Sequence, residues 1–282
     1  AISPNDPQTI FILRGVGPNS VIGGLFVSND AGATWTEKEA GQAFRSIAFN
    51  PENPATILLG TASTSSTTVQ NLYKSTDNGD AWGIVPISWD DYFLDPINYI
   101  AYDANDANNI IVLEGNEIVI SADGGTTWTN YIYGEEPGSY YYGLKASYNP
   151  FQSGEVQITT DFYPVISTDG GATVSQLGNP MFNSNYVGIS TEGDGHLYYG
   201  VQRGLLHKNM TTMTETSNYV EPINFFFSDP APKFSIDSNI EGRVYLFSDS
   251  FTGQYLWVSN EHGGNISQLK FTEFDQFYSV TT

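Results

Sequence analysis

The chain has 282 residues, no cysteine and a formal net charge of −21, from 31 acidic and 10 basic side chains. Without cysteine there is no disulfide, thiolate nucleophile or cysteine-ligated metal. The negative charge repels phosphate backbones and anionic lipid head groups, so we expect no nucleic-acid partner. No run of about 18 apolar residues occurs, so no membrane insertion is expected either. The negative charge is consistent with high solubility, with a bound cation or with a cationic partner.

Short runs of β-branched and aromatic residues, separated by Asn, Pro, Gly and Asp turns, recur along the whole chain. They follow one order, in which an innermost run precedes a second, a third and a fourth. The second runs are predicted at 9–15, 56–61, 109–115, 155–161, 196–202 and 243–249. Innermost runs precede three of them, at 44–49, 97–102 and 142–148. No segment shows a convincing helical period, so an all-β chain is expected.

An eight-residue pattern separates the third run from the fourth. It reads SNDAGATW at 28–35, STDNGDAW at 75–82, SADGGTTW at 121–128 and STDGGATV at 167–174. The opening serines are 47, 46 and 46 residues apart, and a weaker copy, SNEHGGNI, opens 92 residues later at Ser259. The copy expected near residue 213 is missing, although strand-like residues before it maintain the spacing of the repeats. We call these five stretches the octapeptides.

Six repeats of about 46–47 residues therefore fill residues 1–282, a period typical of solenoids, propellers and arrays. Four strands in about 46 residues correspond to one propeller blade. We expect a single domain, a six-bladed β-propeller of four-stranded blades. Residues 1–8 align with the end of an innermost strand and residues 274–282 with the beginning of one, so the C-terminal strand should complete the first blade and remove both sheet edges. A fragment of a seven-bladed or larger propeller would have the same ends.

The octapeptide resembles the Asp-box, or bacterial neuraminidase repeat, of the β-propeller superfamily that contains sialidases, xyloglucanases and sortilin-like proteins. We expect its aspartate to accept hydrogen bonds within the turn, its glycine to take a positive φ and its tryptophan to pack between blades. These roles are structural rather than catalytic. The residues assigned to them are Ser28, Asp30, Gly32, Trp35, Ser75, Asp77, Gly79, Trp82, Ser121, Asp123, Gly125, Trp128, Ser167, Asp169 and Gly171.

Ligand sites of propellers usually lie on the face opposite such turns, where the loops after the second strands meet the loops before the innermost strands. Aromatic side chains in these loops could stack on sugar rings. The aromatic residues predicted there are Trp89, Tyr92, Tyr140, Tyr141, Tyr163 and Tyr186. Asp91 and Asp161 are the alternative, a carboxylate pair for glycoside hydrolysis. Xyloglucanases, which these repeats resemble, carry two catalytic aspartates, usually in a cleft between two propellers.

The sequence gives no reason to expect a metal or a cofactor. No Asp-x-Asp-x-Asp-Gly loop is present, and His196, His207 and His262 are far apart in the sequence, so we expect scattered surface histidines. With four arginines and no Phe/Tyr-Arg-Ile-Pro motif, sialidase activity is not expected.

The expected function is non-enzymatic binding of a glycan or a protein by a secreted or cell-surface bacterial protein. Such a protein could be one module of a longer adhesin or exported enzyme, with further domains as partners. A xyloglucanase-like glycoside hydrolase is the alternative.

Overall fold

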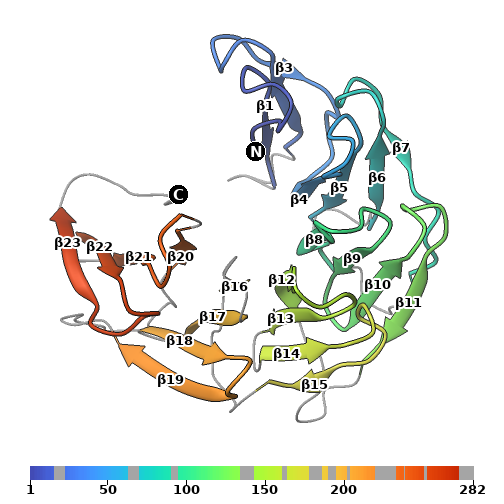
Figure 1. The fold of residues 1–282 in the computed structure, drawn as a ribbon. Coiled ribbons are helices and arrows are strands. Elements are labelled where there is room, and N and C mark those ends of the chain that lie inside the picture. The colour runs from blue at the N-terminus through green and yellow to red at the C-terminus, as the bar shows by residue number, and fades with distance from the viewer. Residues whose placement is uncertain are drawn as a thin grey trace. The chain divides into compact units, whose positions relative to one another are not determined.

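The computed structural model describes residues 1–15, 23–62, 70–89, 95–133, 143–160, 164–177, 186–189, 195–201, 204–219, 233–237, 239–250 and 253–272. These residues form 23 strands in six antiparallel sheets, and none of them is helical (Figure 1). The prediction of an all-β chain is confirmed for this part of the sequence. It accordingly contains no apolar helix long enough to cross a bilayer.

The chain divides into two compact units, of which the first comprises Ala1–Glu136, Tyr140–Ala146 and Asp169–Thr173. The first sheet has the order β1 (Ile10–Leu13), β2 (Leu25–Ser28), β3 (Thr36–Glu37). The second has the order β4 (Phe44–Phe49), β5 (Ile57–Thr61), β6 (Leu72–Ser75), β7 (Gly83–Ile84). The third consists of β8 (Tyr99–Tyr102), β9 (Ile110–Leu113), β10 (Glu117–Ser121) and β11 (Thr129–Ile132).

The second unit comprises Pro137–Ser139, Ser147–Thr168 and Val174–Thr282. The fourth sheet of the chain is β12 (Gly143–Tyr148), β13 (Val156–Thr160), β14 (Pro164–Ser167), β15 (Ser175–Gln176). The fifth is β16 (Tyr186–Ile189), β17 (His196–Val201), β18 (Gly204–Asn209), β19 (Thr214–Tyr219). The sixth is β20 (Lys233–Ile236), β21 (Val244–Ser250), β22 (Gly253–Ser259), β23 (Ser267–Thr272).

The first sheet has three strands, and the first residues of the chain extend it. Ile2 forms an antiparallel bridge with Ile10, and the N–H of Phe11 donates to the carbonyl of Ala1 at 2.8 Å. The segment before β1 therefore pairs like the end of an innermost strand. The C-terminal strand expected beside it, residues 274–282, lies outside the described residues, so closure of a ring stays a prediction.

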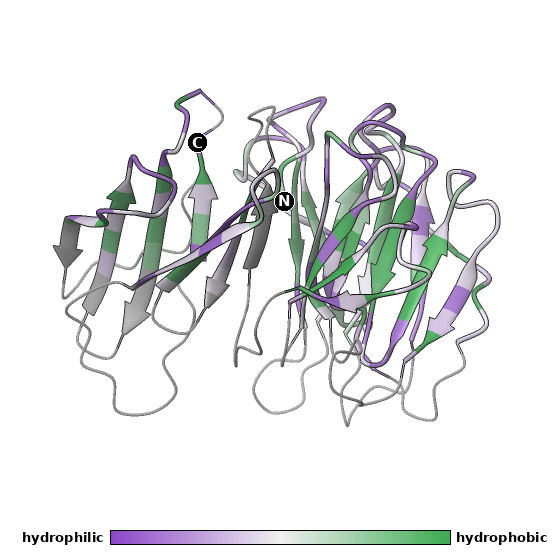
Figure 2. Cartoon of the chain, turned by 60° about the horizontal axis from the view of Figure 1, so that its bottom comes forward, coloured by the Kyte–Doolittle hydropathy of each residue, from purple (hydrophilic) through white to green (hydrophobic). Residues whose placement is uncertain are grey.

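The second strands form the core of the sheets. Every residue of β5, β9 and β13 is buried, whereas the two-residue outer strands β3, β7 and β15 are exposed. A strand covered on both faces can carry a continuous apolar run, which explains the sequences Ile57-Leu58-Leu59 and Ile110-Ile111-Val112. Figure 2 shows this distribution, with hydrophobic residues on the strands and hydrophilic residues in the turns.

The octapeptides connect the last two strands of five sheets and lock their own turns. The Ser28 hydroxyl donates to Asp30 at 2.7 Å and accepts the Gly32 N–H at 2.8 Å. Asp30 accepts the N–H and the hydroxyl of Thr34, at 2.8 and 2.6 Å. The fourth residue of each octapeptide has a positive φ, and in four copies its N–H donates to a carbonyl in the segment just before β1, β5, β9 or β21 of its own sheet. These four donors are Ala31, Asn78, Gly124 and His262.

The octapeptides also contact the preceding sheet. A Cβ added to Gly79 would lie 2.8 Å from Phe11 of β1, and one added to Gly263 would lie 2.9 Å from Leu205 of β18. Trp82 and Trp128 pack against apolar clusters that contain residues of two successive sheets. Trp35, whose sheet is the first in the chain, is 40% exposed.

Candidate functional site

The aromatic surface predicted from the sequence lies mostly outside the described residues. Trp89 is described, and its half-buried side chain packs against an apolar cluster of the second and third sheets that contains Leu58 and Ile97. Tyr186 is described only as the first residue of β16. The residues outside the described ranges are Tyr92, Tyr140, Tyr141, Tyr163 and the alternative pair Asp91 and Asp161. Both the aromatic surface and the carboxylate pair therefore stay predictions.

Two glutamates near this region have no exposed surface, although neither is among the site residues predicted from the sequence. Glu114 and Glu117 flank the turn between β9 and β10, and both are 0% exposed. Asn130 of β11 donates to Glu117 and also to the Ser88 carbonyl. Glu117 thus belongs to a hydrogen-bonded network that joins β10, β11 and the segment before Trp89.

The aspartates of the octapeptides are poor candidates for acid catalysis. Hydrogen bonds from the side chain and backbone of Thr34, and from Ser28, lower the pKa of Asp30 to about 2. Thr127, through its side chain and then its backbone, lowers the pKa of Asp123 to about 2 in the same way. A general acid must hold a proton near the working pH, and these carboxylates remain ionised hydrogen-bond acceptors.

A cluster of three histidines lies in the second unit, and we call His196, His207 and His262 the histidine cluster. The pairing of β17 with β18 places His196 opposite Asn209 and Tyr198 opposite His207. Because side chains alternate between the two faces of a sheet, His196, Tyr198 and His207 share one face. His262 comes from the octapeptide of the sixth sheet, which contacts this part of the fifth sheet.

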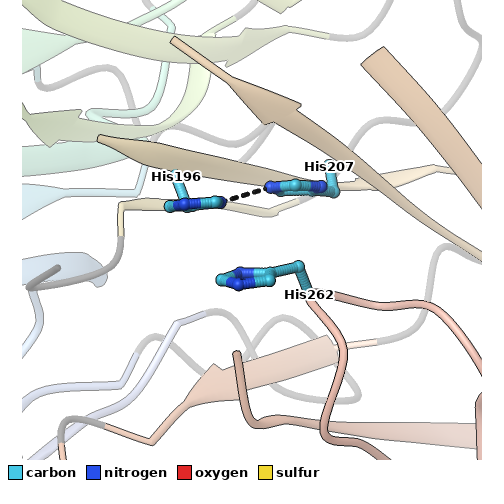
Figure 3. A group of neighbouring side chains, drawn as sticks. All are labelled: His196, His207 and His262. Atoms are coloured by element: carbon cyan, nitrogen blue, oxygen red, sulfur yellow. Dashed lines mark hydrogen bonds between the residues drawn. The ribbon is translucent and has the colours of Figure 1, made fainter. Parts of the chain in front are cut away.

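The three rings are nearly parallel (Figure 3). Nδ1 of His196 and Nε2 of His207 lie 2.7 Å apart, end to end. The ring of His262 stacks on that of His196, with centroids 3.9 Å apart. The hydroxyl of Tyr198, a residue that is 0% exposed, lies 2.7 Å from Nδ1 of His262.

The expectation of scattered surface histidines is wrong. His196 is 6% exposed, the other two are half-buried, and one nitrogen from each ring lies within 4.8 Å of the others. The register of β17 against β18 brings His196 close to His207, although they are 11 residues apart in the sequence. Contact between the fifth and sixth sheets brings His262 next to them. The available signal was the repeat itself, because His262 occupies the fourth octapeptide position, where the other copies have Ala31, Asn78, Gly124 and Gly170.

The histidine cluster offers three imidazole nitrogens, which are ligands for transition metals. Among the described residues it is the one group of three or more histidine, aspartate or glutamate side chains close enough to share a metal ion. No family model matches the chain, and no curated protein matches it.

Solved structures with similar folds include an ancestral GH74 enzyme, with 15% identity over 95% of this chain and a TM-score of 0.66. The match covers 37% of the enzyme chain, so this chain spans well under half of its length. YCF48 bound to D1 peptide has 15% identity over 94% of this chain and 79% of its own, with a TM-score of 0.56. A chain of a nidogen/laminin complex has 10% identity over 93% of this chain and 92% of its own, with a TM-score of 0.57. At such identities the likeness shows the fold alone, and that fold is of the β-propeller type.

Proposed function

We propose that this chain is a non-enzymatic binding module of a secreted or cell-surface bacterial protein, with a protein or a glycan as its ligand. The observation that carries the proposal is the likeness to propellers that hold polypeptide partners. It extends over 79% of YCF48 bound to D1 peptide and 92% of the chain from the nidogen/laminin complex. The octapeptides, which resemble Asp-boxes, support the same reading, since their carboxylates are engaged in turns.

The charge of the chain narrows the kind of partner. A net charge of −21 attracts cationic surfaces and accelerates their association. A basic peptide or protein segment is therefore the first ligand class to test, and neutral glycans are the second. The six predicted aromatic residues provide the contact surface in either case, because aromatic rings bury a large area and carry polar tips.

The test is an array of basic peptides and an array of neutral glycans, each probed with the chain and with the double variant Tyr140→Ala/Tyr141→Ala. We expect retention of at least one ligand class and a loss of about tenfold or more in the variant, as for an interface hot spot. Met213→Ala is the matched control, because Met213 is 60% exposed on a turn of the fifth sheet. Absence of retention on both arrays contradicts the proposal.

A glycoside hydrolase of xyloglucanase type is the second candidate, and the fold likeness to the GH74 enzyme favours it. Asp91 and Asp161 are its proposed carboxylates. If the chain cleaves a neutral plant glucan and Asp91→Ala or Asp161→Ala abolishes cleavage, this second candidate replaces the first. Retention of a glycan by both variants, without turnover by the parent chain, supports the binding module.

A further inference from the structure

We propose that His196, His207 and His262 bind one transition-metal ion of the Zn²⁺, Co²⁺, Ni²⁺ or Cu²⁺ class, which fastens the fifth sheet to the sixth. Imidazole nitrogen is the ligand these ions prefer, whereas Mg²⁺ and Ca²⁺ prefer oxygen. Three histidines also leave one position of a tetrahedral ion for water or a fourth ligand.

The rings lie close enough for such a site to form by side-chain rotation. Nδ1 of His196 and Nε2 of His207 are 2.7 Å apart, and one nitrogen from each of the three rings lies within 4.8 Å of the other two. A tetrahedral Zn²⁺ at about 2.0–2.1 Å from each nitrogen requires separations of about 3.3–3.4 Å. The first pair must therefore open slightly and the widest pair must close by about 1.5 Å at most.

The surroundings of His262 suit a histidine that coordinates a metal ion. The hydroxyl of Tyr198 lies 2.7 Å from Nδ1 of His262, and we therefore assign Nε2 of this ring to the metal. An outer partner of this kind orients a ligating imidazole and fixes its tautomer. Gly242 lies beside Nε2, and a Cβ there would be only 3.2 Å from it. A side chain at position 242 would therefore crowd that nitrogen.

The backbone conformation of His262 also bears on the site. Its φ is 51°, a left-handed conformation that residues with a Cβ adopt infrequently. Glycine occupies the same octapeptide position at Gly124 and Gly170, whereas Ala31 and Asn78 take a positive φ there as well. The position thus accepts several residue types, and in this copy it carries an imidazole that stacks on His196 of the fifth sheet.

The octapeptide pattern is incomplete where the fifth and sixth sheets meet at the histidine cluster. The fifth repeat has no octapeptide, and its hairpin turn is made by 210–213 instead. The octapeptide of the sixth sheet has Glu261 in place of aspartate and Ile266 in place of tryptophan. Its serine, Ser259, donates to the Gly264 carbonyl rather than to an acidic side chain. A metal bridge between His262 and β17–β18 would compensate at this junction.

The experiment uses the chain without an affinity tag, treated with a chelator and then titrated with Zn²⁺ in a calorimeter. We expect one ion per chain, no heat with Mg²⁺ or Ca²⁺, and tetrahedral d–d absorption bands with Co²⁺. At Zn²⁺ concentrations of about 100 times Kd, the Tm should rise by about 5 °C or more.

His262→Asn is the decisive variant, because Asn78 occupies the equivalent position with a φ of 60° and the backbone can accept it. It should weaken Zn²⁺ binding by about tenfold to a hundredfold or more. Asn78→His is the matched control, since it places a histidine on an equivalent turn of another sheet and should not change the stoichiometry. His207→Gln should weaken binding like His262→Asn and serves if that variant does not fold.

Zn²⁺ binding of equal affinity in the parent chain and in both histidine variants would place the ion elsewhere and overturn the proposal. No binding by the folded parent chain would overturn it as well. Neither result bears on the peptide and glycan arrays. The metal-site proposal can therefore be contradicted without contradicting the proposed binding function, and the reverse also holds.

Discussion

At the scale of single residues, the octapeptide turns depend on an ionised aspartate. Asp123 accepts the Thr127 hydroxyl at 2.6 Å and the Thr127 N–H at 2.8 Å, and Ser121 donates to it at 2.8 Å. These bonds require the charged carboxylate, which explains why the pKa of Asp123 falls from 3.8 to about 2. Because the folded pKa lies below the unfolded value, the contribution to stability is present above about pH 4 and is lost as the pH falls through 2.

Asp123→Asn should therefore change how the Tm depends on pH. We expect the variant to be less stable than the parent at pH 7 and to lose less further stability between about pH 4 and pH 2. Thr127→Val removes the hydroxyl that contributes most to the lowered pKa and should also flatten the dependence. Thermal unfolding followed by circular dichroism across this range provides the measurement. Identical slopes in the parent chain and both variants would show that the turn does not depend on the charge.

At the scale of elements, the glycines of an octapeptide differ in what they face. Gly170 has a φ of 74° and no heavy atom within 4 Å of an added Cβ. Gly171 has a φ of 111°, and its added Cβ would lie 3.0 Å from Ile111 and from Ile120 of the third sheet. The hydroxyl of Tyr133 donates to the Gly171 and Ala172 carbonyls at 2.9 Å each. The fourth octapeptide thus rests on the third sheet through Gly171.

Gly171→Ala should destabilise the chain more than Gly170→Ala. Alanine already occupies the position of Gly170 in the first octapeptide, where Ala31 has a φ of 59°, so Gly170→Ala should cost about 1 kcal/mol of unfolding free energy. Gly171→Ala adds overpacking against two isoleucines and should cost about 2–4 kcal/mol. Urea unfolding of the two variants, which differ by one position, checks this. Equal losses would mean that the octapeptide does not pack tightly on the preceding sheet.

The second and third strands of each sheet were predictable because their sequences are distinctive. Ile57–Thr61 and Ile110–Leu113 are apolar runs bounded by turn residues, and the run that ends at Ser75 is fixed by the octapeptide that follows. Three of the outer strands, β3, β7 and β15, have only two residues each, because these residues are exposed and little apolar burial holds the outer edge.

The histidine cluster was not predictable from local sequence. His196 begins a strand, His207 lies within the next strand, and His262 belongs to a turn, so no spacing rule joins them. Their proximity depends on the register of β17 against β18 and on the contact of an octapeptide with the sheet before it. Aligning the repeats was enough to show that His262 replaces a small residue, but not which side chains it meets.

At the scale of the whole molecule, charge is the dominant feature. The 10 basic residues cannot neutralise 31 acidic ones. Among the described residues, Lys38–Asp80 at 3.2 Å and Arg243–Asp237 at 4.0 Å are ion pairs, and the Asp80 side chain is exposed whereas that of Asp237 is mostly covered. A pair with an exposed partner, such as Lys38–Asp80, contributes little. Repulsion among the remaining carboxylates must therefore oppose the compact state at low ionic strength.

Salt should consequently affect stability and partner binding in opposite directions. Raising NaCl from about 10 to about 150 mM shortens the Debye length from about 30 to about 8 Å, which screens repulsion within the chain and attraction to a basic peptide alike. We expect the Tm to rise and the affinity for the peptide to fall, measured by thermal unfolding and calorimetry in the same buffers. Near the sequence isoelectric point of about 4.1 the net charge vanishes, so the effect of salt on the Tm should largely disappear. A Tm that does not rise with salt at pH 7 would show that self-repulsion does not limit stability, and an affinity unchanged by salt would remove charge as the basis of recognition.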